Sequence, residues 1–190
     1  MRRTINLGIC LTLAVSAWAG SSIVGTKPGE FTLRDLKGSE VAASSLGGNV
    51  TAILFIATKC PVSNAYNERM STLYRDYAPK GVKFIFVNSN HTEPAAEVED
   101  HGKQHGFPFA VYKDPSNVVA DLFRAQATPE AFVLDGSGTV RYHGHIDDSQ
   151  NPARISKQGL RLALDALLGG GSVDPAETKA FGCSIKRVKQ

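Results

Sequence analysis

Two short apolar runs, residues 51–56 and 82–87, most constrain what this chain can fold into. Each run is almost continuously apolar, which is typical of a β-strand buried on both faces of a sheet. The segment between them, residues 64–77, places apolar side chains at helical spacing and ends before Pro79 and Gly81. A strand, a helix and a second strand in this order predict a parallel pair of strands joined by a right-handed crossover.

The rest of the chain alternates between strand and helix patterns. Strands are predicted at 31–35, 40–42, 109–112, 131–134 and 139–142, and helices at 93–105, 116–123 and 156–168. The first two strands flank a glycine-containing turn and the last two flank Asp135-Gly136-Ser137-Gly138, so each pair predicts a β-hairpin. These patterns together predict an α/β fold, in which a central mixed β-sheet is flanked by helices on both faces.

The N-terminus is typical of a secretory signal peptide. Arg2 and Arg3 precede an apolar core of residues 5–17, and Ala17-Trp18-Ala19 offers a cleavage site of small residues. The predicted organisation is a signal peptide over 1–19, an irregular lead-in over 20–28, one domain over 29–170 and a C-terminal tail over 171–190. We therefore predict an exported protein, periplasmic or extracellular, with no stable membrane insertion after cleavage. The alternative is that the leader is retained as a membrane anchor.

The charge of the chain argues against two classes of partner. The whole chain carries a formal net charge of +3, and loss of two leader arginines leaves +1. A nearly neutral mature chain gives no indication of binding to nucleic acid or to a charged membrane surface. Of the three cysteines, Cys10 lies in the predicted leader, so Cys60 and Cys183 remain. In an oxidising compartment such a pair permits one disulfide without requiring it.

Cys60 lies where an apolar run gives way to a helix pattern with Pro61 at its first position. The first backbone N–H groups of a helix have no partners within the helix, and the helix dipole favours negative charge there. A cysteine at such a position is stabilised as the thiolate, which is its nucleophilic form. Lys59 adds a positive charge beside it. The alternative interpretation is a buried, inert cysteine that only fills space.

His143, His145 and Asp147 alternate along the sequence and would share one face of an extended strand. Two imidazoles and a carboxylate can bind zinc, copper or iron. No fourth ligand is indicated, so we favour a solvated strand end and predict no metal site. The three residues are kept as weak candidates, and no other cofactor is implied.

Three motifs resemble those of thioredoxin-fold proteins. Thr58-Lys59-Cys60-Pro61-Val62-Ser63 lies where thioredoxin-like proteins carry their redox motif, and Thr128-Pro129 opens a strand as the cis-proline of those proteins does. The hairpin starting at 31–35 resembles the extra N-terminal β-hairpin of the redoxins, the alkyl hydroperoxide reductase/thiol-specific antioxidant family. Residues 88–90, 144–148 and 182–186 resemble the peroxiredoxin-like branch of that family. The resemblance covers residues 29–187 and implies a cis bond at Pro129.

Departures from the family motifs limit what the resemblance implies about the reaction. Ser63 stands where thioredoxins have their second cysteine, so no disulfide can form within the motif. Ala57 and Ile53 stand where typical peroxiredoxins have a threonine or serine and a proline. The arginine that peroxiredoxins place beside the peroxide is not evident, and Arg69 and Arg124 are its only candidate substitutes.

The resemblance implies a thiol-dependent oxidoreductase that acts through Cys60, and peroxide reduction is the preferred reaction. A peroxidase needs a thiolate, a hydrogen-bonding pocket and a route from the sulfenic acid back to the thiol. Cys60 would supply the thiolate, Thr58 and the N–H groups of the helix part of the pocket, and an external thiol the reducing equivalents. Ser63 is interpreted first as a hydrogen-bonding residue of the first helical turn, and second as a support for the thiolate.

Three interpretations of Cys183 stay open: a thiol that resolves oxidised Cys60, a structural disulfide partner of Cys60, or a free thiol of the tail. Two other functions also stay open. The first is a monothiol oxidoreductase that attacks protein disulfides from Cys60, with Thr128 and Pro129 accepting the extended substrate chain. The second is a redox-inert or metal-binding module that is not an enzyme and uses His143 and His145.

Overall fold

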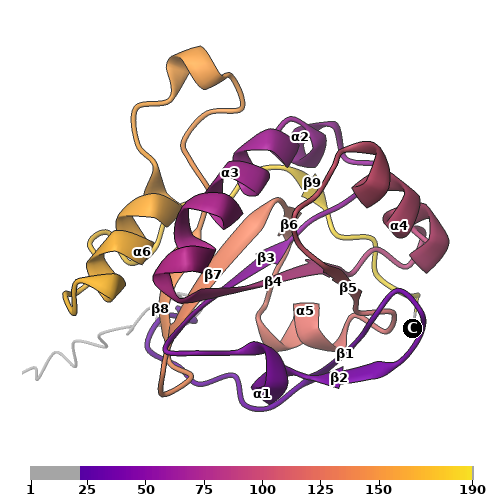
Figure 1. The fold of residues 1–190 in the computed structure, drawn as a ribbon, viewed down its shortest axis with the longest axis horizontal. Coiled ribbons are helices and arrows are strands. Elements are labelled where there is room, and N and C mark those ends of the chain that lie inside the picture. Colours follow the sequence, from indigo (N-terminus) through magenta and orange to yellow (C-terminus); the bar gives the residue numbers. More distant parts are fainter. Residues whose placement is uncertain (1–21, 190) are drawn as a thin grey trace, which may run out of the picture.

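A seven-stranded mixed β-sheet forms the centre of the molecule (Figure 1). We analysed a computed structural model that describes residues 22–189, so the predicted signal peptide lies outside the described residues. The sheet order is β2-β1-β5-β4-β3-β7-β8. The strands are β1 (Thr32–Arg34), β2 (Glu40–Ala42), β3 (Val50–Phe55), β4 (Val82–Asn88), β5 (Val111–Lys113), β7 (Glu130–Asp135) and β8 (Val140–Gly144).

The two apolar runs of the sequence form neighbouring strands at the middle of this sheet. Strand β3 is buried along its whole length and pairs with β4 in parallel, from Val50 beside Val82 to Phe55 beside Val87. On its other side, β3 pairs with β7 in the antiparallel direction. The predicted parallel pair and the mixed sheet are therefore confirmed, and the C-terminal end of β3 leads directly to Cys60.

Helices cover both faces of the sheet, as the sequence predicts (Figure 1). They are α1 (Ala43–Leu46), α2 (Pro61–Asn64), α3 (Asn67–Tyr77), α4 (Ala95–Gln104), α5 (Val118–Leu122) and α6 (Gly159–Leu168), with 3₁₀ turns η1 (Ala78–Lys80) and η2 (Pro152–Arg154). On one face, α3 and α6 bury Met70 and Leu160 in the same apolar cluster as Leu54. On the other face, α5 buries Val119 in the cluster that contains Phe55.

The helix predicted over 64–77 is in fact two helices. Helix α2 begins at Pro61 and α3 begins at Asn67, with Ala65 and Tyr66 between them. The backbone N–H of Tyr66 bonds to the carbonyl of Ser63, a three-residue spacing that tightens the chain locally. The Tyr66 side chain is fully buried and its hydroxyl donates to Asp147 at 2.8 Å. Burial of this tyrosine thus accompanies the break, which helical spacing alone does not reveal.

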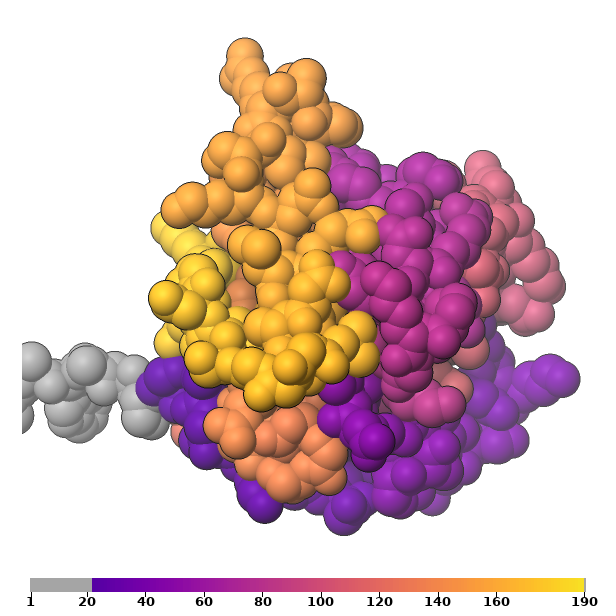
Figure 2. Space-filling model, turned by 60° about the vertical axis from the view of Figure 1, so that its left-hand side comes forward, coloured from indigo at the N-terminus to yellow at the C-terminus, as the bar shows by residue number. Residues whose placement is uncertain are grey.

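Three other helices begin later than predicted, and one of them, α5, spans Val118–Leu122 rather than 116–123. Helix α4 starts at Ala95 rather than residue 93, because Pro94 has an extended backbone and is the N-cap, and Glu93 before it turns its carboxylate toward the segment before Cys60. Helix α6 starts at Gly159 rather than residue 156, after a loop that contains η2. This loop stands out from the body of the molecule (Figure 2).

The tail is part of the folded structure. Strand β9 (Cys183–Ser184) pairs with β6 (Ala127–Thr128) to form a separate two-stranded sheet. Earlier in the tail, the N–H of Thr178 donates to the carbonyl of His143 at 2.9 Å, which places the segment along the edge of β8. Among residues 22–189, no helix is long and apolar enough to cross a membrane.

Candidate active site

Cys60 occupies the N-cap position of helix α2, as the sequence predicts. Its backbone is extended, Pro61 follows at the first helical position, and its sulfur accepts a hydrogen bond from the N–H of Ser63 at 3.3 Å. The hydroxyl of Ser63 accepts from the N–H of Ala57 at 3.1 Å. Ser63 is therefore a hydrogen-bonding residue of the first turn, its preferred interpretation, and its N–H also contacts the sulfur.

Cys60 and Cys183 form a disulfide across 123 residues of sequence, with Cα atoms 5.8 Å apart. This spacing lies in the usual range for disulfides. The free-thiol interpretation of Cys183 is thus wrong. A resolving thiol and a structural partner both agree with the bond. The Cys60 side chain is 3 % exposed, whereas Cys183 is half-buried.

Thr128 lies beside the disulfide and directly precedes Pro129. The Thr128–Pro129 peptide bond is cis, as predicted. The carbonyl oxygen of Thr128 is 3.3 Å from the sulfur of Cys60, and the Thr128 hydroxyl donates to the carbonyl of Cys183 at 3.4 Å. The redox pair therefore sits between a helix N-terminus and the short strand β6.

The segment before Cys60 is held by Glu93, which is 2 % exposed. One carboxylate oxygen accepts from the N–H of Thr58 at 2.8 Å, and the other accepts from the N–H of Lys59 at 3.1 Å. Asn88 and Asn90 also donate to it, at 2.5 and 2.9 Å. Burial alone would raise the pKa of Glu93, but these four donors together lower it below its usual value. Glu93 is therefore a buried carboxylate that fixes the backbone next to the redox cysteine.

Lys113 lies beneath the same cluster and is 7 % exposed. Its ammonium donates to the side chain of Asn88 at 2.5 Å and to the carbonyls of Asn90 and Glu93 at 2.9 and 2.7 Å. Burial lowers the pKa of Lys113 to about 8, with the charges of Glu93 and Asp114 acting in the opposite direction. Sequence reasoning missed Glu93 and Lys113. An acidic residue just before Pro94 and a lysine ending a strand pattern were the only signals.

Thr58 and Lys59, predicted to assist Cys60, have Glu97 as their partner. The hydroxyl of Thr58 donates to Glu97 at 3.3 Å, and the ammonium of Lys59 forms an ion pair with it at 2.9 Å. The Lys59 side chain is exposed. The positive charge of Lys59, which the sequence analysis expected beside the Cys60 sulfur, is thus paired with the carboxylate of Glu97.

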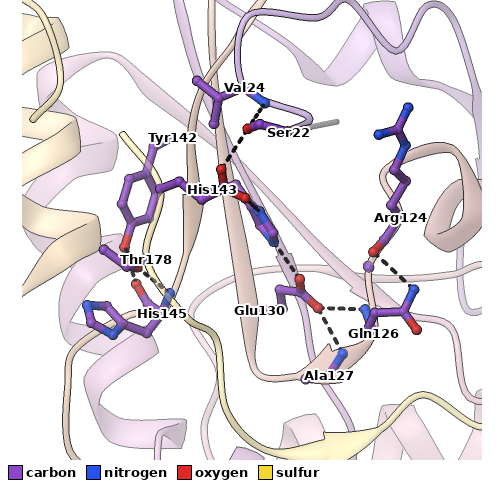
Figure 3. A network of polar contacts seen from close by, with 12 residues as sticks. Ser22, Val24, Arg124, Gln126, Ala127, Glu130, Tyr142, His143, His145 and Thr178 are labelled. Carbon is purple, nitrogen blue, oxygen red and sulfur yellow. Dashed lines mark hydrogen bonds and ion pairs between the residues drawn. The ribbon is translucent and has the colours of Figure 1, made fainter. Parts of the chain in front are cut away.

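A second buried carboxylate, Glu130, holds strand β6 (Figure 3). One oxygen of Glu130 accepts from the N–H groups of Gln126 and Ala127 at 2.7 and 2.8 Å. The other oxygen accepts from Nε2 of His143 at 2.6 Å, and Nδ1 of His143 lies 3.3 Å from Glu177. Burial alone would lower the pKa of His143, but Glu130 and then Glu177 raise it overall. His143 thus bridges the strand beside Cys60 and the tail.

The weak metal candidates are not brought together. Strand β8 ends at Gly144, so His145 does not continue the strand face of His143 and lies on the side of Tyr142 (Figure 3). Asp147 accepts from Tyr66 and Arg69. Within residues 22–189, no group of three or more His, Cys, Asp or Glu side chains could hold a metal ion. The prediction that the three share one face is wrong because the strand ends between them.

The peroxide-binding role considered for Arg69 finds no support in its position. Its guanidinium donates to both oxygens of Asp147, at 2.8 and 2.7 Å, and to the carbonyls of Ser149 and Gln150. It also lies over the ring of Tyr66. These contacts fix the loop after β8 rather than the environment of the sulfur.

Comparison with known families and proteins agrees with this geometry. A model of the AhpC/TSA family matches residues 24–143. The chain belongs to the AhpC/TSA family. It is 30 % identical to the thiol-disulfide oxidoreductase ResA of Geobacillus kaustophilus over 118 residues, which are 62 % of this chain and 67 % of that protein.

Two further relatives extend the similarity to more of the chain. The thiol:disulfide interchange protein DsbE of Allochromatium vinosum is 29 % identical over 160 residues, 77 % of this chain and 86 % of that protein. A crystal structure of a hypothetical protein from Sinorhizobium meliloti has a TM-score of 0.81 at 29 % identity and covers 90 % of this chain and 98 % of that one. Together with the Cys60–Cys183 pair, these relatives confirm a thiol-dependent oxidoreductase of the thioredoxin fold.

Proposed function

We propose that this AhpC/TSA-family protein exchanges thiols with protein disulfides, and that Cys60 and Cys183 are its two active thiols. The observation that carries the proposal is the position of the Cys60–Cys183 bond, next to the main chain of strand β6. A strand edge presents N–H and C=O groups that an extended polypeptide can pair with. The names of the ResA and DsbE relatives support the same reaction class.

The reaction runs in two exchanges that conserve atoms and electrons. In the reduced protein, the Cys60 thiolate attacks one sulfur of the substrate disulfide, and the other substrate sulfur leaves as a thiolate that takes up a proton. The Cys183 thiolate then attacks the sulfur of Cys60, which forms the Cys60–Cys183 disulfide and releases the substrate as a dithiol. Two electrons pass to the substrate. An external thiol reductant returns both cysteines to thiols.

Each nearby residue has a role in this scheme. The N–H of Ser63, which contacts the sulfur at 3.3 Å, stabilises the Cys60 thiolate that attacks and leaves. Thr128 and Pro129 present the backbone against which the substrate chain lies. Glu93 is a positioning residue that acts through the backbone of Thr58 and Lys59. Cys183 acts as the resolving thiol, which replaces the monothiol scheme with a two-cysteine cycle.

Peroxide reduction, the reaction preferred from the sequence, is the alternative to this proposal. The two residues considered for a peroxide pocket bind other groups: the Thr58 hydroxyl donates to Glu97, and Arg69 binds Asp147. The disulfide reaction needs no such pocket, because it uses only the thiols and a strand edge. We also propose that the protein is exported, since its predicted leader suits a compartment in which disulfides persist.

The test is the reduction of insulin disulfides by the purified protein with dithiothreitol as reductant. We expect the wild type to accelerate the reduction and Cys60→Ala to abolish the acceleration. Cys183→Ala should form an adduct between Cys60 and insulin, visible by intact mass and peptide mapping, and resolve it slowly. A wild type that leaves insulin intact but consumes hydrogen peroxide at Cys60 would replace our proposal with the peroxidase. Equal rates for wild type and Cys60→Ala would remove Cys60 from either reaction.

A further inference from the structure

Strand β6 lies outside the large sheet and takes its strand partner from the tail. Residues Ala127 and Thr128 pair with Ser184 and Cys183 in the antiparallel direction. The N–H of Ile185 continues the pairing by donating to the carbonyl of Gln126 at 3.0 Å. We call Gln126–Thr128 the β6 edge. In this oxidised state, the β6 edge is occupied by an extended segment of the protein's own chain.

Beyond the β6 edge, the tail is held by main-chain hydrogen bonds and by Arg187, whose side chain pairs with Asp121 and donates to the carbonyl of Ala125 at 2.7 Å. The N–H of Lys186 donates to the side chain of Asn90 at 2.7 Å, and its carbonyl accepts from the N–H of His91 at 3.0 Å. The N–H of Val188 donates to the side chain of Asn117 at 2.8 Å. Main-chain contacts of this kind accept almost any sequence in the bound segment.

Among residues 183–185, which lie along the β6 edge, the side chain of Ile185 adds selectivity. Ile185 is 6 % exposed and belongs to the apolar cluster that α5 forms with the sheet, which includes Val119 and Phe123. Ser184 is exposed, while Cys183 is bonded to Cys60. The bound pattern is thus a reacting cysteine, an outward residue and an inward aliphatic residue, as the alternation of an extended strand requires.

We propose that the apolar position occupied by Ile185 selects the substrate, so that a segment bound along the β6 edge has an aliphatic residue two positions after its reactive cysteine. The tail shows the register: substrate cysteine beside Thr128, next residue outward, aliphatic residue in the position of Ile185. This inference rests on the proposed function, because it names the class of protein disulfide that Cys60 attacks. Segments with an aliphatic residue at this position should bind about tenfold or more tightly than segments with a charged residue there, because the position is buried.

The same arrangement makes substrate release part of the reaction. The tail and the substrate need the same backbone groups of Gln126 and Thr128, so both cannot be bound there at once. In the mixed disulfide, the substrate is bonded to Cys60 and the tail is displaced. When the Cys183 thiolate attacks the sulfur of Cys60, the Cys60–substrate bond breaks, the substrate leaves as a thiolate, and the tail regains the edge.

The experiment uses the Cys183→Ala protein and three peptides. The parent peptide has the sequence of residues 182–186, with its cysteine bonded to the coloured leaving group 2-nitro-5-thiobenzoate. The second peptide has aspartate in place of the isoleucine, and the third has aspartate in place of the serine. Because one protein variant meets all three peptides, differences between their rates cannot come from misfolding. The measured quantity is the rate of leaving-group release at Cys60.

We expect the parent peptide to react about tenfold or more faster than the peptide without isoleucine. The peptide changed at the outward serine should react within about threefold of the parent, which controls for the added charge. Adding Ile185→Ser to Cys183→Ala should speed the parent peptide, because the weakened tail competes less. Equal rates for all three peptides would overturn the inference while leaving the proposed function intact. The proposed function fails separately if Cys60 forms no adduct with insulin.

Discussion

The two halves of the Cys60–Cys183 disulfide are held in opposite ways. Cys60 is buried, caps a helix and follows a backbone segment that a buried carboxylate holds through two N–H groups. Cys183 lies in a strand of two residues, and its neighbours Gly182 and Ser184 are exposed. One sulfur belongs to the core of the domain, and the other belongs to a segment laid over its surface.

The difference suits a protein that must break and remake this bond. A nucleophile works best when its position is fixed before the reaction, since ordering it during the reaction raises the barrier. A resolving thiol must instead leave and return, so its segment should be held by contacts that open at low free energy. Buried polar groups hold Cys60, whereas main-chain bonds, Ile185 and the partly exposed side chains of Phe181 and Arg187 hold the tail around Cys183. Each side can be perturbed separately.

The largest effect is expected from Glu93→Ala, on the fixed side. The substitution removes four hydrogen bonds to a buried carboxylate and the first of the negative charges that act on the Lys113 ammonium, leaving Asp114 and Glu97. We expect the free energy of unfolding of the oxidised protein to fall by about 3 kcal/mol, because buried polar groups left without partners are costly. Urea denaturation of the wild type and the variant measures this difference.

The matched control for this prediction is Glu97→Ala. Glu97 also contacts the segment before Cys60, but through the exposed Lys59 side chain and the Thr58 hydroxyl. An exposed ion pair contributes little, so we expect a loss below about 1 kcal/mol. Equal losses for the two variants would contradict the idea that burial of the Glu93 carboxylate fixes this side of the disulfide.

A smaller effect is expected from Gly182→Ala, on the removable side. A Cβ atom at Gly182 would overlap the carbonyl oxygen of Thr128, so the tail can approach the β6 edge this closely only with glycine there. The overlap should cost about 2 kcal/mol in the disulfide-bonded state, as overpacking usually does. The equilibrium constant for forming the disulfide in a dithiothreitol redox buffer should therefore fall about thirtyfold.

Ser184→Ala serves as the control for that measurement, because Ser184 is exposed and keeps its backbone pairing with Ala127. Its disulfide equilibrium should stay within about twofold of the wild type, as expected for a surface substitution. The oxidised fraction can be read by mass after alkylation of free thiols. An unchanged equilibrium for Gly182→Ala would show that the tail reaches Cys60 without close contact at Thr128.

The sequence was sufficient to predict the fold and the place of Cys60 at a helix start. Buried parallel strands have continuous apolar runs, which located β3 and β4, and a cysteine before Pro61 located the helix start. These signals are local, so one sequence contains them completely. The cis bond at Pro129 was predicted through resemblance rather than through any local pattern.

The contacts that hold the two halves in place were harder to predict because they join distant parts of the chain. Strand β9 has two residues and pairs with another strand of two residues, too few for a periodic pattern. Glu93 and Glu130 lie 33 and 70 residues after Cys60, and nothing in their local sequence distinguishes them from solvated carboxylates. Only the folded topology brings these residues to the ends of β3 and β6.

The smallest effect is expected from pH, through His143, which connects the two sides. The pKa of His143 is raised above its ordinary value of 6.5 by Glu130 and Glu177 against the effect of burial. The stabilisation of the folded state by His143 is therefore complete below pH 6.5. It is lost as the pH rises through the raised pKa, because the folded state then gives up its extra proton. We expect the loss to be about 1 kcal/mol, comparable to one hydrogen bond.

Comparison of His143→Gln with Glu177→Gln separates the two arms of this link. Both variants should flatten the fall in unfolding free energy above pH 6.5, and His143→Gln should flatten it more, because it removes the titrating group itself. Glu177→Gln keeps the bond between His143 and Glu130 and weakens only the contact of His143 with the tail. The pH dependence of unfolding that remains in this variant therefore reports on the bond to Glu130, which holds the β6 edge. A wild-type slope retained in both variants would mean that His143 does not couple the tail to the strand beside Cys60.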